Sequence, residues 1–369
     1  MSEKFFAATR KGLFRVERAE AGDWRITRHV FVGDSVTILL DDPRDGTVYA
    51  GLNLGHFGVK LHRSEDRGES WNEIQAPGFP AEPSDDLDAT PGAPSVHQLW
   101  ALEAGGTDET GLLWAGTIPG ALFRSTDRGE SWQLNQPLWN RPERENWFGG
   151  GYDDPGIHSI CVDPRDSRHL TVGVSCGGVW VTRNGGETWD CKTRGMYAEY
   201  MPEERREDPD IQDPHRIVQC TAAPDVLWAQ HHNGVFRSND AGEEWTPITS
   251  IQPSKFGFVV AAHPDDPETA WFVPGVKDEC RIPVGGQVVV ARTRDGGQSF
   301  DVLRDGLPQE HAYDLVFRHA LDVDETGGTL AFGSTTGSLW VSEDGGDRWR
   351  VVSNHLPPIY QVLFAREQG

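Results

Sequence analysis

The sequence contains no apolar run that approaches the roughly 20 residues of a membrane-spanning helix. Its first residues, MSEKFFAATRKGLF, have no apolar stretch of signal-peptide length and no small-residue cleavage site. Positive charge is also scarce, because 34 Lys and Arg stand against 57 Asp and Glu and give a formal net charge of −23. Such a surface opposes binding to a nucleic-acid backbone or an anionic membrane. We therefore expect neither nucleic acid nor membrane as a partner.

Several short catalytic and redox motifs are missing as well. The five cysteines are an odd number and include no Cys-x-x-Cys pair, so the sequence indicates neither a disulfide framework nor a thioredoxin-type motif. There is no Gly-x-Ser-x-Gly elbow, no phosphate-binding Gly-Lys-Ser/Thr loop, no dinucleotide fingerprint and no His-Glu-x-x-His metal motif. Together with the missing export signal, the unpaired cysteines predict a cytoplasmic protein with reduced thiols.

The most informative feature that is present is an octapeptide, Ser/Thr-x-Asp-x-Gly-x-x-Trp, which returns six times along the chain. The third copy has Asn184 in place of the Asp, and the fifth ends in Phe300. We expect the first and third residues to bond the backbone of a tight turn, and the Gly to adopt a backbone angle that other residues resist. The final Trp, for example Trp132, is expected to be buried between neighbouring sheets. The copies cover residues 64–71, 125–132, 182–189, 238–245, 293–300 and 342–349.

Each copy belongs to a repeat of about 50–60 residues, a period typical of propellers and solenoids. In the first complete repeat, strand A is expected at 36–40, strand B at 47–51 and strand C at 59–63, and strand D begins at Trp71. Pro and Gly residues mark the turns between these strands.

The two ends of the chain look like parts of one further repeat. Strands of the B, C and D type are expected at 5–9, 12–17 and 23–27, and a single A-type strand at 359–364. We therefore predict an all-β, seven-bladed propeller of four-stranded antiparallel blades, in which the N- and C-terminal strands close the last blade. Residues 1–369 form a single domain in this prediction. Six blades are the alternative.

The octapeptide resembles the Asp-box, or bacterial neuraminidase (BNR) repeat, of a propeller superfamily that includes sialidases, xyloglucanases, sortilin-type receptors and a photosystem II assembly factor. This resemblance covers the whole chain and implies a protein of the BNR-repeat glycosyl hydrolase kind. In that superfamily the boxes lie on the rim, away from the active site, so they are compatible with any function. A true sialidase is not indicated, because the Arg-Ile-Pro sequence that sialidases carry near their first strand occurs here at 281–283.

The order of the strands determines which loops share a face of the ring. Because consecutive strands of a blade are antiparallel, the A–B and C–D turns lie on one face, and the D–A connections and B–C loops lie on the other. We call the second face the functional face. Long segments gather on it, and connections of such length favour a functional role. They are the D–A connections at about 75–95, 137–156 and 194–214, and a B–C insertion at 274–285.

Three histidines, His97, His158 and His215, open the A strands of successive blades. Imidazoles at matching positions on neighbouring inner strands can converge on a divalent metal ion at the axis of the ring. The alternative is structural, because a histidine that opens an inner strand can simply hydrogen-bond the next blade.

Carboxylates on the functional face suggest glycoside hydrolysis, which needs one carboxyl group as acid and another as base or nucleophile. Asp154 and Asp213 each stand directly before a Pro and just ahead of a strand-opening His; with Glu145 they are the candidate catalytic residues. In a chain with 57 acidic residues, solvated loop carboxylates are the alternative. The side chains expected to bind the ligand are His56, His231, His232, Trp147, Tyr200, Arg216 and His311.

These residues predict an axial funnel lined by histidines, acids and aromatic rings. We therefore expect a glycosyl hydrolase-like enzyme that acts on a small molecule or glycan. The alternative is a non-catalytic scaffold that grips a protein or a small ligand on the same face, for which a broad apolar patch would be typical.

Overall fold

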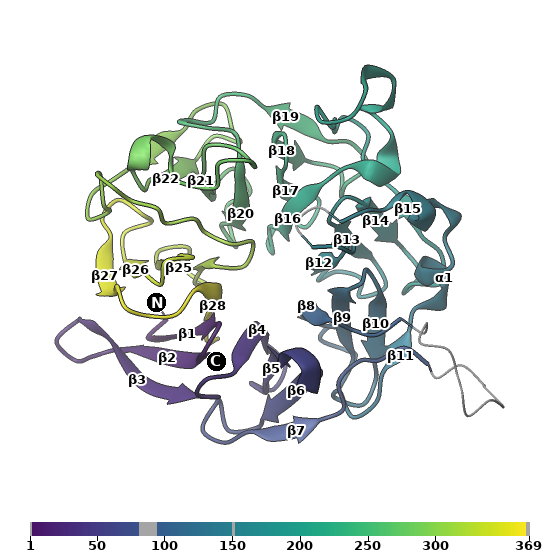
Figure 1. The fold of residues 1–369 in the computed structure, drawn as a ribbon, viewed down its shortest axis with the longest axis horizontal. Helices are drawn as coiled ribbons and strands as arrows, with labels where there is room; N and C mark the ends of the chain where they lie inside the picture. Colours follow the sequence, from purple (N-terminus) through teal and green to yellow (C-terminus); the bar gives the residue numbers. More distant parts are fainter. Residues whose placement is uncertain (1, 81–93, 150–151, 367–369) are drawn as a thin grey trace.

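The structure, a computed structural model, describes residues 2–80, 94–149 and 152–366, and contains seven four-stranded antiparallel sheets. Figure 1 shows the sheets arranged as blades around one axis, with the A strands innermost. The predicted seven-bladed propeller is confirmed, and the six-bladed alternative is wrong. No helix among the described residues is long and apolar enough to span a membrane.

Blades one to three follow each other along the chain. Blade one consists of β4 (Ser35–Asp41), β5 (Val48–Asn53), β6 (Val59–Ser64) and β7 (Asn72–Ile74). Blade two consists of β8 (Gln98–Ala104), β9 (Leu113–Ile118), β10 (Leu122–Ser125) and β11 (Gln133–Leu134). Blade three consists of β12 (Ile157–Val162), β13 (Leu170–Val174), β14 (Gly178–Thr182) and β15 (Asp190–Cys191).

Blades four to six continue in the same order. Blade four consists of β16 (Pro214–Gln219), β17 (Leu227–His231), β18 (Gly234–Ser238) and β19 (Thr246–Ile248). Blade five consists of β20 (Gly257–Ala262), β21 (Ala270–Pro274), β22 (Val290–Thr293) and β23 (Asp301–Leu303). Blade six consists of β24 (Leu321–Val323), β25 (Leu330–Gly333), β26 (Leu339–Ser342) and β27 (Arg350–Ser353).

Blade seven joins the two ends of the chain, as predicted. Its strands are β28 (Ile359–Phe364), β1 (Lys4–Thr9), β2 (Gly12–Arg18) and β3 (Trp24–Val30), in that spatial order. β28 pairs antiparallel with β1, from Phe5 opposite Phe364 to Thr9 opposite Ile359. Each inner strand also packs against the inner strands of both neighbouring blades, so that the ring is continuous.

The octapeptide forms the expected turn. In the first copy, the Ser64 hydroxyl donates to Asp66 Oδ1 (2.8 Å) and accepts from the Gly68 N–H (2.7 Å), and the Ser70 N–H donates to Asp66 Oδ1 (2.8 Å). Asn184 preserves the geometry in the third copy, because its Oδ1 accepts from the Thr188 N–H at 3.0 Å. The fifth-position glycines of all six copies have φ between 85° and 98°, a region that favours glycine.

The final tryptophans differ in burial, which corrects the expectation for Trp132. That ring is only half-buried, whereas Trp245 is 1% exposed. The long connection after β15 covers Trp245, whose Nε1–H donates to the Lys192 carbonyl at 3.0 Å and whose ring shares an apolar cluster with Met196. We therefore expect the tryptophan to contribute more to stability at position 245 than at position 132.

Replacement of Trp245 by Ala is expected to lower the free energy of unfolding by ~3–5 kcal/mol, because it removes a buried ring and its hydrogen bond. Trp132→Ala should cost clearly less, since part of that ring already contacts solvent. Urea unfolding followed by circular dichroism measures both. Equal losses in the two variants would show that burial of the ring does not set its contribution.

Candidate functional site

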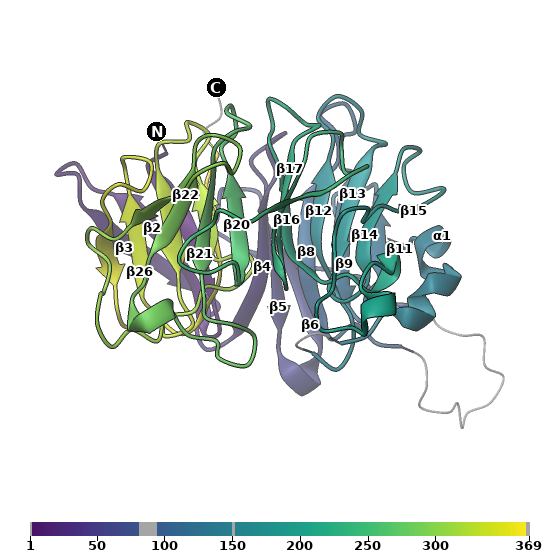
Figure 2. The same cartoon turned by 90° about the horizontal axis from the view of Figure 1, so that it is seen from above.

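The functional face carries the long connections, as the strand order requires. In the side view of Figure 2 the loop after β5 extends below the ring, and both chain ends lie above it. On this lower, functional side, the start of β16 brings together a group of charged and aromatic residues that we call the axial cluster. Its members are Trp100, Tyr152, His158, Tyr200, Asp213, His215, His232, Phe258 and Arg318.

Asp213 is the best anchored carboxylate of the cluster. It lies between the 3-10 helix η4 (Pro209–Ile211) and β16, and only 1% of the residue is exposed. Its Oδ1 accepts hydrogen bonds from the Ser175 hydroxyl (3.2 Å) and from the N–H of Cys176 (3.1 Å). Cys176 has φ of 48°, a left-handed conformation that non-glycine residues rarely adopt. The main chain of Asp213 is also fixed, because its carbonyl accepts from the His232 N–H at 2.9 Å.

The second carboxylate oxygen of Asp213 faces two imidazoles. His215 Nε2 lies 3.3 Å from Oδ2, and His232 Nδ1 lies 3.4 Å from the same atom. Burial by itself would raise the pKa of Asp213, but His215, His232 and the Arg318 guanidinium outweigh it and hold this pKa well below its ordinary value. Asp213 is therefore an ionised carboxylate in a buried position.

Across from Asp213 the cluster presents hydrogen-bond donors. The Arg318 side chain lies between two rings, 4.7 Å from the Trp100 centroid and 5.1 Å from the Phe258 centroid, and the residue is 8% exposed. Within the described parts of the chain it makes no ion pair, and its buried Nε has no partner. His158 Nδ1 lies 2.8 Å from the Ser159 hydroxyl, and its buried Nε2 is likewise without a partner. Buried nitrogens without hydrogen-bond partners indicate a place for ligand or water atoms.

The three predicted metal ligands do not come together. Among the described residues, the one group of His, Cys, Asp and Glu whose ligand atoms all lie within 4.8 Å of one another is Asp213, His215 and His232. His97 instead turns toward solvent, where Nδ1 lies 3.6 Å from Asp154 Oδ2. His158 packs edge-on against Trp100 at 5.5 Å. The strand registers give the reason, because the irregularity near the start of the strand falls at His158 in β12 and at His215 in β16, but at Trp100 in β8, three residues after His97.

Some of the predicted ligand-binding residues lie in the cluster or against it. The Tyr200 ring stands edge-on to His232 at 5.0 Å, and its hydroxyl donates to the Ile211 carbonyl at 2.7 Å. His231 is fully buried, and its Nε2 lies 3.0 Å from the Asp213 nitrogen. Burial lowers the pKa of His231 to about 3, so the ring is neutral and supports Asp213 from behind.

Other predicted residues lie elsewhere. Trp147 belongs to the apolar core, with its ring 5.7 Å from that of Trp180. Arg216 donates to the His158 carbonyl at 3.2 Å, and burial lowers the pKa of its guanidinium. The remaining three are exposed, in the 3-10 helix η1 (Gly55–Phe57), in the 3-10 helix η2 (Pro142–Asn146) and in the connection before β24; they are His56, Glu145 and His311.

Sequence reasoning missed Arg318 and His319. His319 Nε2 donates to the His158 carbonyl at 2.8 Å, which links blades six and three across the axis. A signal for it exists in the sequence, because His158-Ser-Ile-Cys-Val-Asp and His319-Ala-Leu-Asp-Val-Asp share one pattern at the start of strand A. That alignment identifies His319, rather than His311, as the blade-six counterpart of His158.

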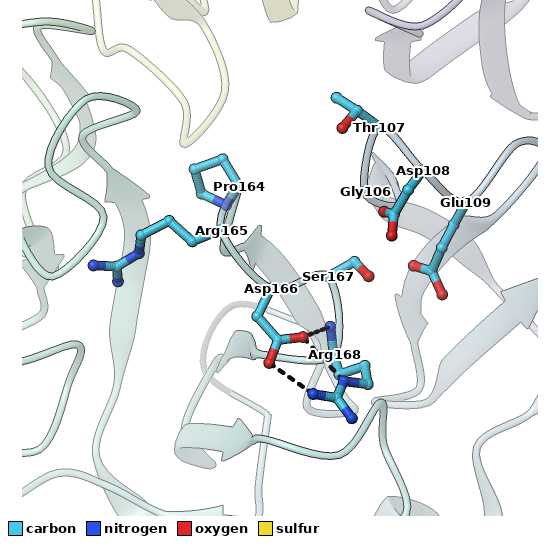
Figure 3. A pocket seen from close by; sticks show the side chains of 9 residues that line it. All are labelled: Gly106, Thr107, Asp108, Glu109, Pro164, Arg165, Asp166, Ser167 and Arg168. Carbon is cyan, nitrogen blue, oxygen red and sulfur yellow. Dashed lines mark hydrogen bonds and ion pairs between the residues drawn. The ribbon is translucent and has the colours of Figure 1, made fainter.

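Two cavities lie away from the axial cluster. One, of about 560 Å³, lies between the A–B turns of blades two and three, opposite the functional face, and is lined by residues 106–109 and 164–168. Figure 3 shows that its Arg168 is bonded to Asp166. The other, of about 650 Å³, lies at the outer rim beside β15. There Lys192 pairs with Glu243, and burial raises the pKa of Cys191 to about 12, which leaves a poor nucleophile. Neither cavity is the candidate site.

No protein-family profile matches the chain. Among curated proteins, the oligoxyloglucan-reducing end-specific xyloglucanase of Emericella nidulans is 23% identical over 342 residues, which cover 88% of this chain and 35% of that protein. A xyloglucanase of a Paenibacillus species is 30% identical over 150 residues, which cover 37% of this chain and 14% of that protein. The chain thus spans about a third or less of the length of these proteins.

Solved structures give the same picture of the fold. A GH74 enzyme of Niastella koreensis superposes with a TM-score of 0.62 at 14% identity, over 95% of this chain and 54% of the other. YCF48 bound to D1 peptide superposes with a TM-score of 0.51 at 13% identity, over 85% of this chain and 81% of the other. The chain is a seven-bladed propeller distantly similar to GH74 xyloglucanases and to YCF48. At these identities the likeness to solved structures establishes the fold alone.

A further acidic residue, Asp322, lies on the inner strand β24. Its Oδ2 accepts from the Phe364 N–H at 2.7 Å. Burial nevertheless raises the pKa of Asp322 to about 6, against this hydrogen bond and the charges of Arg366 and Arg216. The pKa of Asp322 is higher in the folded state than in the unfolded state. Its contribution to the free energy of unfolding is therefore least favourable at high pH. The loss begins near pH 4 and is complete above pH 6.

Asp322→Asn is therefore expected to be more stable relative to wild type at pH 8 than at pH 4. The difference in free energy of unfolding between variant and wild type should increase by about 1–2 kcal/mol between these pH values. The amide keeps an acceptor for the Phe364 N–H and carries no charge. Urea unfolding of both proteins at the two pH values measures the difference. A variant that is equally stable relative to wild type at both pH values would contradict the raised pKa.

Proposed function

We propose that the chain is a hydrolytic enzyme of the glycosyl hydrolase kind and that it binds a small glycan or glycan-like molecule at the axial cluster. The observation that carries this proposal is Asp213, a buried and ionised carboxylate that two hydrogen bonds hold in place at Oδ1. Such a group can orient a nucleophilic water and stabilise positive charge that develops on the sugar, but its low pKa makes it a weak base and unable to serve as the proton donor.

The acid role is assigned to Asp154. Its Oδ2 lies 3.6 Å from His97 Nδ1, and it follows by two positions Tyr152, whose ring stands edge-on to Trp100 of the cluster at 5.2 Å. Glu145 is exposed in η2 and is the weaker candidate. The similarity to xyloglucanases over 88% of the chain supports a glycan substrate.

The unpaired donors of Arg318 and His158 indicate which ligand groups the cluster accepts. A guanidinium between two aromatic rings binds oxygen acceptors well, and carboxylates or phosphates best. Aromatic rings such as Trp100 and Tyr152 also suit contact with the apolar face of a sugar. We propose a sugar or sugar-like substrate, with preference for one that bears an acidic group.

We also propose that the protein is located in the cytoplasm. All five cysteines are free thiols, which supports a reducing compartment such as the cytoplasm.

Asp213→Asn is expected to lower kcat/KM at least about 100-fold, because it removes the negative charge that orients the water and stabilises the transition state. Asp154→Asn should lower it too, most with substrates whose leaving group needs protonation. The assay measures release of reducing sugar from xyloglucan oligosaccharides and from nitrophenyl glycosides with neutral and uronic acid sugars. The matched control is Asp190→Asn, an exposed carboxylate on β15, which should keep wild-type activity. If wild type cleaves none of these substrates, or if Asp213→Asn cleaves them as fast, the proposal fails.

A second candidate function, peptide binding, is favoured by the distribution of exposed apolar side chains. Among the described residues, eight large apolar side chains are exposed, and six of them lie in loops of the functional face. These six are Val32, Phe57, Phe148, Tyr152, Tyr200 and Tyr313. The chain also matches most of the length of YCF48, which was solved bound to a peptide. A scaffold that grips a peptide on this face is therefore the alternative.

Panning of a phage-displayed dodecapeptide library tests this alternative. Selected peptides should bind a Phe57→Ser/Tyr313→Ser double variant at least about tenfold more weakly, because these two side chains are 71% and 64% exposed and offer apolar contact area. Ile26→Ser, an exposed apolar side chain on the outer strand β3, is the control and should not change binding. A library that yields no enriched peptide, or equal binding by both variants, excludes this function.

A further inference from the structure

The donor atoms of Asp213, His215 and His232 are close enough together to hold one metal ion. We infer that Asp213, His215 and His232 form a binding site for a divalent transition metal, of which Zn²⁺ fits best. The inference rests on the site of the proposed function and deepens it, since the ion would occupy the reacting centre.

The geometry agrees with tetrahedral coordination. Zn²⁺ binds imidazole nitrogen and carboxylate oxygen at about 2.0–2.2 Å, and tetrahedral angles then place neighbouring donors about 3.3–3.6 Å apart. The observed separations from Asp213 Oδ2 are 3.3 Å to His215 Nε2 and 3.4 Å to His232 Nδ1. All three donor atoms lie within 4.8 Å of one another. Two imidazoles and one carboxylate are a frequent ligand set for catalytic zinc.

The neighbours of the donors hold them in the orientation that a metal requires. His215 Nδ1 donates to the Gly257 carbonyl at 2.6 Å, so its Nε2 is left to face Asp213. A lone pair on Nε2 would point at a carboxylate oxygen, so either a proton or a metal ion must lie between Nε2 and Asp213 Oδ2, and a metal ion fits the same separation. The Phe258 ring stacks on His215 at 4.5 Å and keeps it in plane.

Asp213 is oriented in the same way. Ser175 and Cys176 bond its Oδ1, and this leaves Oδ2 as the free oxygen that points to the two histidines. Hydrogen bonds to the non-ligating atoms of metal ligands are typical of metal sites, where they fix the ring tautomer and the carboxylate.

The cluster also leaves a way in for the ion. Of the three side chains, His215 and Asp213 are buried, whereas the His232 side chain is 22% exposed. Three protein ligands leave the fourth tetrahedral position for water or a ligand oxygen, as in catalytic rather than structural zinc sites. The Arg318 guanidinium lies over the Phe258 ring, which stacks on His215, and this places it to hold an acidic group of a molecule bound at that position.

Isothermal titration of Zn²⁺ into chelator-treated, tag-free protein tests the site without any assay of activity. Wild type is expected to bind one ion with a Kd below about 1 µM. His232→Gln, which changes the most exposed ligand, should weaken binding about 100-fold or more. The matched control is His355→Gln, an exposed histidine in the connection before β28, which should bind like wild type.

Co²⁺ provides a second measurement that needs no variant. Bound at this site, it should give the intense visible absorption of tetrahedral Co²⁺, which an equimolar amount of Zn²⁺ should abolish. Absence of saturable one-to-one Zn²⁺ binding by wild type, or wild-type affinity in folded His232→Gln, would overturn the inference. Metal binding without glycan cleavage would leave this inference standing and contradict only the proposed function.

Discussion

Closure of the ring by β28 and β1 is the constraint on which the other features of the structure depend. The two ends of the chain supply one blade, and every inner strand thereby gains a neighbour on each side. An open ring would leave two unpaired sheet faces and an unpaired strand edge. Once the ring is closed, the seven A strands surround one axis. The axial cluster is a consequence of that geometry, because residues from blades two to six meet there although they lie far apart in sequence.

Polar groups that meet at an axis must find partners, since an unpaired buried charge is costly. Most of the axial groups satisfy this requirement inside the protein. The His158 carbonyl accepts from Arg216 and His319, and Asp213 accepts from Ser175 and Cys176. Within the axial cluster, all of whose residues the structure describes, the exceptions are the unpartnered nitrogens of Arg318 and His158. They lie on the functional face in the same cluster as Asp213, the buried carboxylate that two imidazoles contact. Unpartnered nitrogens together with a buried charge indicate a binding site rather than a set of structural contacts.

The fold could be predicted from the sequence because its signals are local and repeated. Each octapeptide specifies a turn through side chains that bond within the same eight residues, as Ser64 and Asp66 do. The site could be predicted only in part. The sequence indicated Asp213 through its position before a strand-opening His. Its partner His232 lies on another loop of the blade, so their contact depends on the conformation of the 230–234 turn. Likewise, His97 and His158 looked equivalent in the sequence, but the strand registers put Trp100 at the position of His158. The sequence did not indicate Arg318 as a site residue, because an arginine suggests a binding site only when it is buried without a partner, and this is visible only in the structure.

The most direct test of this account is a crystal structure of the protein soaked with a xyloglucan oligosaccharide and, separately, with a uronic acid disaccharide. The account predicts ligand density on the functional face, in contact with His232, Tyr200 and Arg318, with an acidic group on the Arg318 guanidinium. Density confined to the cavity between the A–B turns of blades two and three, or to the outer rim beside β15, would contradict it. So would crystals in which neither sugar binds at the axial cluster at concentrations that saturate a glycoside hydrolase.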